Sequence, residues 1–200
     1  LAYQNAGNLD KALPLLEESL RLKRKFRGKD HPDTFVSMNN LALVYQESGK
    51  FDKALPLYEE TIKLQRDLLG DNHLNTLTTI NNLALGYKEA GKMDKALPLY
   101  EESLQLRRRQ FPGHWRTYDT AAQLGGVLAK MKKYQEAEPL LLEGVQGMQS
   151  QREKIPLRSR GRIKSRITYL VKLYEAWDKP IETAKWKTAL ANEIRRKPQN

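Results

Sequence analysis

Asp-Lys-Ala-Leu-Pro-Leu stands at residues 10–15, 52–57 and 94–99, so that successive copies begin 42 residues apart. Asn-Asn-Leu-Ala at residues 39–42 returns at 81–84 with the same step. Single residues keep this register too: Tyr3, Tyr45 and Tyr87, and Gly7, Gly49 and Gly91. A fixed period of this length indicates one structural unit that is copied and stacked, in place of a single globular core.

The apolar spacing inside one period, residues 30–70, predicts a pair of helices. Four residues of the first helix fall on one stripe, namely Met38, Leu41, Val44 and Tyr45. Gly49 is expected to end this helix in the left-handed conformation. A second apolar run follows, which Asp52 is expected to cap and Gly70 to end.

Polar residues precede each predicted first helix and are expected to cap it. At residues 30–33 they are Asp-His-Pro-Asp, in which proline suits the first turn and an acid suits the positive end of the helix dipole. Asp71 and Asn72 are expected to do the same for the next unit.

Small residues recur where the two helices of a pair are expected to cross. They are Ala42, Ala84 and Gly125 on first helices and Ala12, Ala54, Ala96 and Ala137 on second helices. Helix axes about 8–10 Å apart require small side chains at the crossing point. The pattern therefore predicts tightly packed helical hairpins.

The spaced motif Leu41-Ala42-x-x-Tyr45-x-x-x-Gly49-x-Phe51-x-x-Ala54-x-x-x-Tyr58 resembles the tetratricopeptide repeat. Its longer period, with a loop such as Gly28–Thr34 and an Asn-Asn-Leu-Ala opening, resembles the kinesin light chain type. The resemblance covers essentially the whole chain and is clearest over residues 1–111. It implies a solenoid whose first helices line a concave face that binds other proteins.

We therefore predict an all-α chain, a right-handed superhelical solenoid of antiparallel helix pairs. Its predicted repeats are a partial one at 1–28, then 29–70, 71–111, a degenerate one at 112–153, and 154–200 with a C-terminal capping helix. Pro156 and Gly161 are expected to interrupt any helix around them, which leaves the conformation of residues 146–166 open. Because the chain begins inside a repeat, we expect it to be part of a longer protein.

Two later segments carry a second resemblance. Residues 137–145 and 174–180 are similar to the ends of repeat regions that follow bacterial Ser/Thr protein kinase domains. This resemblance implies an upstream kinase in the parent protein, for which the repeats would be a regulatory or docking tail. The 200 residues themselves contain no Gly-rich phosphate loop, no kinase catalytic-loop motif and no Asp-Phe-Gly.

The composition bounds the chemistry. The chain has no cysteine, which excludes disulfides and thiolate catalysis and favours a reducing compartment. No signal peptide is visible, and no apolar run approaches the length of about 18 residues that a membrane span needs. Motifs for a catalytic serine elbow or a phosphate-binding loop are also missing. We expect a cytoplasmic protein that is not an enzyme and needs no cofactor.

Three histidines recur in equivalent loops, at His31, His73 and His114. Zinc ligands must all lie within about 2 Å of one ion, whereas equivalent residues of stacked repeats are spread along the array. The histidines are therefore interpreted as structural loop residues, and no metal site is predicted.

The net charge of +11 is unevenly distributed, with +1 in residues 1–100 and +10 in residues 101–200. Residues 152–166 carry seven basic side chains and one acid, Glu153. Three interpretations remain open: a solvated connection, an electrostatic rim for an acidic partner, or nucleic-acid binding through the basic C-terminal half. No aromatic residue lies between Tyr134 and Tyr169, which argues against stacking on single-stranded nucleic acid.

The repeated asparagines are the best site candidates, because a side-chain amide can both donate to and accept from the backbone of an extended peptide. The predicted peptide-binding groove consists of Asn39, Leu43, Gln46, Asn81, Leu85 and Lys88, with Asn40 and Asn82 as weaker candidates. The alternative is that the amides bond neighbouring helices. The kinesin light chain resemblance implies acidic peptides as ligands of Asn39, Asn81 and Lys88. Ala122 and Gly126 take the corresponding places in the fourth unit. The predicted function is a protein–protein interaction scaffold. The sequence does not define its oligomeric state.

Overall fold

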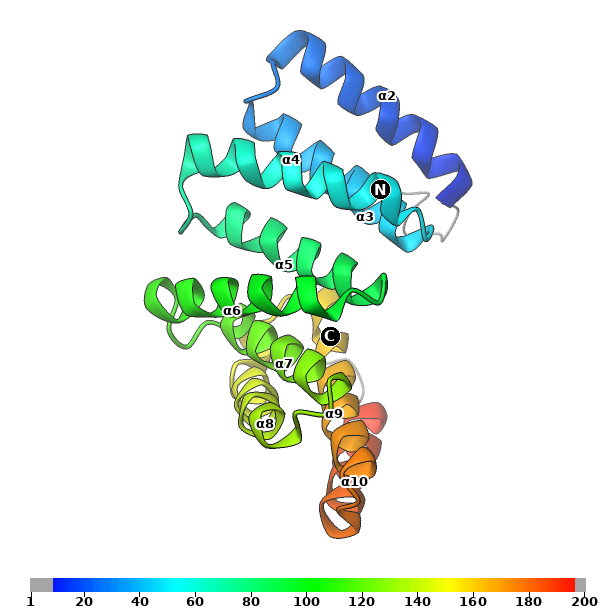
Figure 1. The fold of residues 1–200 in the computed structure, drawn as a ribbon, viewed down its shortest axis with the longest axis vertical. Coiled ribbons are helices and arrows are strands. Elements are labelled where there is room, and N and C mark those ends of the chain that lie inside the picture. The colour runs from blue at the N-terminus through cyan, green and yellow to red at the C-terminus, as the bar shows by residue number, and fades with distance from the viewer. Residues whose placement is uncertain (1–8, 197–200) are drawn as a thin grey trace. The chain divides into compact units, whose positions relative to one another are not determined.

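The computed structural model describes residues 9–196 and is helical over most of that span (Figure 1). Tyr3 and Gly7, which continue the repeat register in the sequence, lie outside the described residues. The helices of the described part are α2 (Leu9–Arg27), α3 (Pro32–Glu47), α4 (Phe51–Leu69), α5 (Leu74–Glu89), α6 (Met93–Gln110), α7 (Trp115–Lys130), α8 (Tyr134–Ser150), a short 3-10 turn (Arg152–Lys154), α9 (Leu157–Ala176) and α10 (Pro180–Arg195). No strand occurs between residues 9 and 196, so the predicted all-α class is confirmed.

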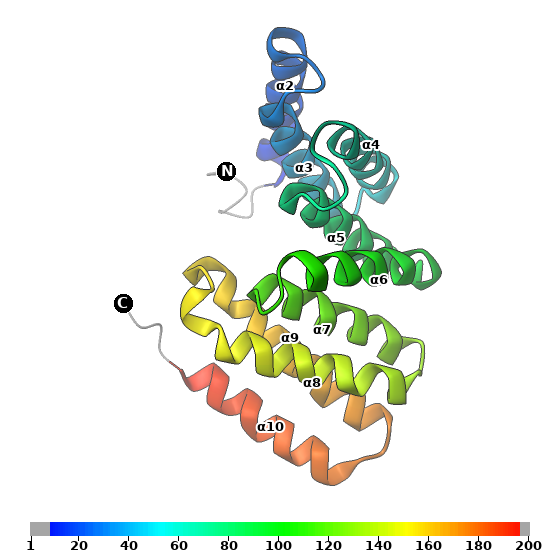
Figure 2. The same ribbon diagram turned by 90° about the vertical axis from the view of Figure 1, so that its left-hand side faces the viewer.

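The chain divides into two compact units, residues 1–99 and 100–200, with the boundary inside α6. In unit 1, α2 packs on α3, and α4 packs on both α3 and α5. In unit 2, α8 packs on α7 and on α9, and α9 packs in turn on α10 (Figure 2). Loops of a few residues join packed neighbours, so each pair is antiparallel. We call α3, α5, α7 and α9 first helices and the even-numbered ones second helices.

Three loops are closed in the same way before a first helix. In each, a histidine Nδ1 accepts the backbone N–H two residues later, at 3.1 Å for His31 and 3.2 Å for His73 and His114. Each following threonine hydroxyl donates to a carbonyl six residues back, at 2.8–3.0 Å: Thr34, Thr76 and Thr117. The histidines are thus helix N-caps, as their structural interpretation requires. The cap of α3 lies within the predicted polar stretch 30–33, whereas α5 is capped by His73 and not by the predicted Asp71-Asn72.

The turn inside each pair depends on a left-handed residue. Gly49 has φ +71° and Gly91 has φ +77°, which confirms the expected stop of the first helix. The second helix α4 begins directly after Lys50, whose carbonyl accepts the N–H groups of Lys53 and Ala54. Asp52 therefore lies in the first turn and is not the cap that the sequence predicted.

The helix crossings are closely packed by small residues. Ala42, Ala54 and Ala84 are fully buried. At Gly125, an added Cβ would lie 2.8 Å from the Leu141 Cγ atom and 3.0 Å from the Ala137 carbonyl oxygen. Any side chain there would push α7 away from α8, which explains the small residue at this position.

One expectation about the basic C-terminal part is wrong. Gly161 does not interrupt a helix but lies inside α9, which runs unbroken from Leu157 to Ala176. Pro156 does stand at an interruption, because it lies between the 3-10 turn that ends at Lys154 and the start of α9 at Leu157. The basic residues from Arg158 onward are therefore helical and have fixed spacings along one helix.

Candidate functional site

The asparagines of unit 1 form a row, defined as Asn39 and Asn40 on α3 and Asn81 and Asn82 on α5. Asn39 Nδ2 donates to the Thr79 hydroxyl at 3.0 Å, and Asn39 Oδ1 accepts from Asn82 Nδ2 at 3.1 Å. Thr79 in turn donates to the Asn75 carbonyl at 3.1 Å. The amide of Asn39 thus joins α3 to α5, as in the alternative interpretation of the row. All four asparagines are half-buried.

The other predicted groove residues lie on the same two helices. Leu43 and Leu85 are half-buried, whereas only 5% of Gln46 and 7% of Lys88 is exposed. Gln46 Nε2 donates to a carboxylate oxygen of Glu89 at 2.7 Å, and its Oε1 accepts from the Tyr58 hydroxyl at 3.2 Å. Unit 1 therefore brings the amides of Asn39 and Asn82 into contact, while Gln46 serves mainly as a link between helices.

Tyrosine–glutamate pairs tie first helices to the second helices that precede them. Tyr45 donates to Glu17 and Tyr87 donates to Glu59, each at 2.5 Å. Burial, and then the neighbouring carboxylate, raises the pKa of Tyr45 and of Tyr87 to about 12. The same bond returns in unit 2, where Tyr174 donates to Glu138 at 2.7 Å. These pairs are structural.

A hollow of about 570 Å³ lies in unit 1 between α4, α5 and the beginning of α6. Ile62, Ile80 and Leu83 supply apolar lining, and Lys95 and Asp94 supply charges. None of the predicted groove residues lines it. The hollow is therefore separate from the asparagine row.

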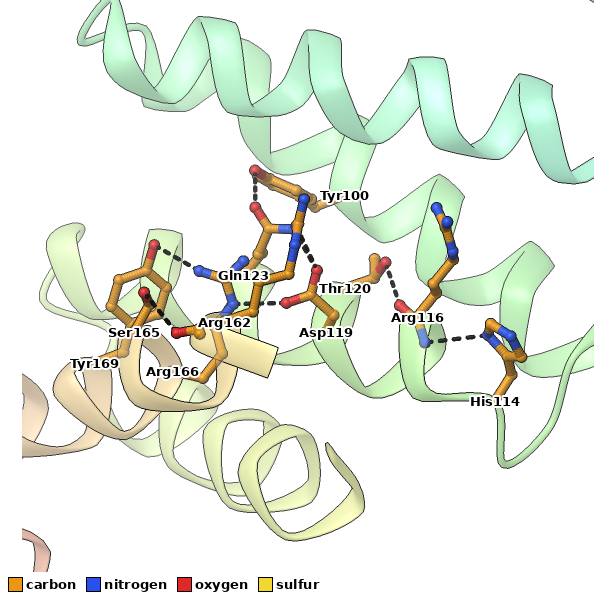
Figure 3. Close-up of polar contacts among 11 residues, drawn as sticks. Tyr100, His114, Arg116, Asp119, Thr120, Gln123, Arg162, Ser165, Arg166 and Tyr169 are labelled. Atoms are coloured by element: carbon orange, nitrogen blue, oxygen red, sulfur yellow. Dashed lines mark hydrogen bonds and ion pairs between the residues drawn. The ribbon is translucent and has the colours of Figure 1, made fainter. Parts of the chain in front are cut away.

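Unit 2 contains a charged cluster that the sequence did not predict, shown in Figure 3. Asp119 on α7 is 4% exposed and accepts from two arginines of α9. Its Oδ1 lies 2.7 Å from Arg166 Nε, and its Oδ2 lies 3.0 Å from Arg162 Nη1. Arg166 also donates to the Tyr169 hydroxyl at 3.2 Å. We use the name arginine cluster for Arg116, Arg158, Arg162 and Arg166 around Asp119.

Electrostatics distinguish the members of the arginine cluster. Burial alone would raise the pKa of Asp119, but the guanidinium groups of Arg166 and Arg162 outweigh it and lower that pKa. Asp119 is therefore a carboxylate at neutral pH. Burial and the positive charges of Arg162 and Arg158 lower the pKa of Arg116. The arginines are thus close enough to repel one another.

A sequence signal for this cluster existed on α9. Arg158, Arg162 and Arg166 recur at every fourth residue and therefore share one helix face, once residues 157–176 are known to be helical. Asp119 gave no such signal, because a threonine, Thr78, stands 41 residues earlier. The pairing of α7 with α9 is needed to bring the acid to the arginines.

No group of three or more metal-binding side chains converges anywhere in residues 9–196. Within the same residues, no helix combines the length and the apolar character that crossing a bilayer would require.

A family model described as tetratricopeptide repeat matches residues 1–67 and, overlapping them, residues 39–109. Together these two spans cover more than half of the chain. A search of curated proteins gives no significant match.

Solved structures resemble the chain over nearly its whole length. The crystal structure of nearly identical TPR-like repeats, from a Podosopora anserina protein assigned as a kinesin light chain, is 22% identical with a TM-score of 0.76 and covers 98% of this chain and 93% of its own. BtubC (BKLC) from P. vanneervenii is 20% identical with a TM-score of 0.79, over 99% of this chain and 79% of its own. MamA from Desulfovibrio magneticus RS-1 is 14% identical with a TM-score of 0.56, over 99% and 92%. Likeness at these identities establishes a shared fold.

Proposed function

The chain belongs to the tetratricopeptide repeat family, and from that premise we propose that it is a scaffold that holds an extended segment of a partner protein. Repeats of this family generally mediate protein–protein interactions. The proposed scaffold acts in the cytoplasm and catalyses no reaction of its own. The segment lies against the first helices of unit 1, along the asparagine row.

The repeated placement of Asn39 and Asn81 on neighbouring first helices carries this proposal. An extended peptide advances about 3.3 Å per residue, and packed helices lie about 8–10 Å apart, so each helix meets about every third residue of the ligand. An amide at each step can hold the ligand backbone. Leu43 and Leu85, both half-buried, supply apolar contact between the amides.

The contacts within unit 1 suggest different roles for the four asparagines of the row. Asn39 and Asn82 bond to each other, so they position the row, and Asn81, which stands on α5 at the place that Asn39 has on α3, is the proposed main contact. Asn40 is half-buried and flanks this contact as a secondary one. Gln46 and Lys88 are buried, so they present only their edges to a ligand.

The test is a titration of the whole chain with labelled neutral and acidic peptides, followed by fluorescence anisotropy. Asn81→Ala and Leu85→Ala should each weaken binding about tenfold, which is typical of a central contact. Gln105→Ala, an exposed amide on a second helix, is the matched control and should leave affinity unchanged. If no peptide binds, and Asn39→Ala and Asn81→Ala lower only the melting temperature, the row is structural and the proposal fails.

We extend the proposal to the parent protein, in which the repeats would be the docking tail of a larger bacterial signalling protein such as a Ser/Thr kinase. The likeness of residues 137–145 and 174–180 to the ends of kinase-linked repeats supports it. The adjoining coding sequence tests it, and a parent gene without a kinase domain would remove it.

A further inference from the structure

Four of the seven basic residues in the stretch 152–166 are paired with carboxylates in the described part of the chain, whereas Lys154, Arg158 and Lys164 are exposed. Arg152 pairs with Glu193, and Arg160 pairs with Glu153 at 3.0 Å. Arg166 has only 8% of its side chain exposed and is held by Asp119. Its positive charge is therefore committed to the interior of unit 2.

Three arginines of the arginine cluster remain at least partly exposed. Arg158 is exposed, 48% of the Arg162 side chain is exposed, and Arg116 is half-buried. Of these three, Arg162 alone forms an ion pair with a carboxylate in the described part of the chain, and that carboxylate is Asp119. Because Asp119 already neutralises the buried Arg166, one carboxylate serves several guanidinium groups.

These three groups come from two packed helices, α7 and α9. Arg158 and Arg162 lie one turn apart on α9. Arg116 lies on the first turn of α7, one turn before Asp119, and its guanidinium is 4.9 Å from the Trp115 ring. Arg162 bridges from α9 to Asp119 on α7 (Figure 3), and Arg162 and Arg158 are near enough to Arg116 for their charges to add to burial in lowering its pKa.

We propose that Arg116, Arg158 and Arg162 bind an anionic side chain, a carboxylate or a phosphoryl group, carried by an acidic segment of a partner protein. Guanidinium groups present paired N–H donors that match both kinds of anionic oxygen group. An anion placed among them would also offset the repulsion between the guanidinium groups, which adds to burial in lowering the pKa of Arg116. The inference rests on the proposed scaffold function but not on the asparagine row.

The distribution of charged side chains favours a protein ligand over nucleic acid. A nucleic acid backbone needs a track of cations, and single strands also need aromatic platforms for stacking. Here the neighbouring cations Arg152 and Arg160 are paired with carboxylates, and Asp119 places a negative charge inside the cluster. The site therefore suits one or two isolated anionic groups.

The experiment uses the whole chain and four labelled probes of equal length. They are a glutamate-rich peptide, a phosphoserine-containing peptide, a glutamine-substituted neutral peptide and a single-stranded oligonucleotide. The double variant Arg116→Gln/Arg158→Gln removes two of the arginines and leaves both ion pairs of Asp119 in place. Lys154→Gln/Lys164→Gln is the matched control, because it removes two exposed charges of the same stretch. Circular dichroism checks folding, and Arg158→Gln alone, an exposed site, serves if the double variant is unstable.

The inference expects the anionic peptides to bind more tightly than the neutral one, and the arginine variant to weaken them at least about tenfold. The lysine variant should weaken them less than about twofold, as general screening would. The peptide that loses more affinity in the arginine variant identifies the anionic group as carboxylate or phosphoryl.

Three results would overturn the inference: equal losses in both double variants, no binding of either anionic peptide, or an oligonucleotide that binds more tightly and depends on the same arginines. A peptide that responds to Asn81→Ala but not to the arginine variant would remove this site and leave the scaffold proposal standing. Dependence on the arginines alone would support this site and remove the asparagine row as the contact.

Discussion

Asn82 donates a hydrogen bond to Asn39 across two helices at 3.1 Å, although the residues are 43 apart in the chain. Asn39 completes its own bonding by donating to Thr79, whose side chain is fully buried. The repeat period thus places amides of successive units in mutual contact. The bond links α3 to α5.

Asn39→Ala should lower the free energy of unfolding by about 1–2 kcal/mol, because it leaves the Asn82 amide and the buried Thr79 hydroxyl without this partner. Urea denaturation measures the loss. Asn40→Ala is the neighbouring control, since no hydrogen bond joins its half-buried side chain to another described residue, and it should cost less than about 0.5 kcal/mol. Equal losses would show that the amide bonds of Asn39 contribute nothing specific.

Asp119→Asn should lower the free energy of unfolding by about 3–5 kcal/mol, because it leaves the buried Arg166 without its counter-charge. Glu153→Gln breaks an ion pair whose acid is mostly exposed, and it should cost less than about 1 kcal/mol. Chemical denaturation at neutral pH compares the two. A small loss in Asp119→Asn would mean that Arg166 is satisfied by other groups.

Acid should remove the stabilisation that the ionised Asp119 side chain gives to the folded state. Because its pKa in the folded state is lowered, the stabilisation is complete above the ordinary aspartate pKa of about 3.9. It is lost as the pH falls below that value and through the lower pKa of the folded state. The difference in stability between the natural chain and Asp119→Asn should therefore be constant from neutral pH to about 5 and shrink below about 4. A difference that stays constant in strong acid would contradict the assignment.

Two glycines of unit 2 should respond oppositely to alanine. A Cβ at Gly147 would overlap the Tyr118 ring, so Gly147→Ala should cost about 1–3 kcal/mol or more through overpacking of α7 against α8. A Cβ at Gly161 meets nothing within 4 Å, and the residue lies inside α9. Gly161→Ala should therefore stabilise the chain by about 0.5–1 kcal/mol. Thermal melting of both variants tests this prediction. Changes in melting temperature of the same sign in the two variants would contradict the described packing at these glycines.

Alkali should weaken unit 1 through its tyrosine–glutamate pairs. Since the pKa of Tyr45 and of Tyr87 is raised to about 12, their stabilisation is complete below the ordinary tyrosine pKa of about 10. It is lost as the pH rises from about 10 through about 12. Ultraviolet titration should show an absorbance change from tyrosines that ionise well above pH 10. Each of the substitutions Tyr45→Phe and Tyr87→Phe should make that late change smaller. Ionisation of every tyrosine near pH 10 would refute the prediction.

The helical hairpins could be predicted because the period repeats the same apolar stripe, small crossing residue and terminal glycine in each unit. The residue at which each helix begins was harder to predict. Lys50 is the N-cap of α4, because its carbonyl already accepts two backbone N–H groups right after the left-handed Gly49, and this leaves Asp52 no role as a cap. Gly161 was misread because glycine weakens a helix without breaking one whose other residues are packed.

The arginine cluster could not be predicted from the repeat. Asp119 and Arg166 are 47 residues apart, and neither continues a residue type of the earlier units. Their contact depends on how α7 and α9 pack, which local spacing does not encode. The tight approach of Tyr169 to Gly126, where a Cβ would lie 2.8 Å from the ring, helps set that packing.

The histidine and threonine closure of each loop has an evolutionary consequence. Each helix start is completed by residues of its own loop and borrows nothing from a distant part of the chain. An unequal crossover that cuts two loops at matching points would therefore insert or delete a whole hairpin with its cap intact. Genes for such chains can therefore gain or lose whole helical hairpins. We expect related proteins to differ in their number of hairpins.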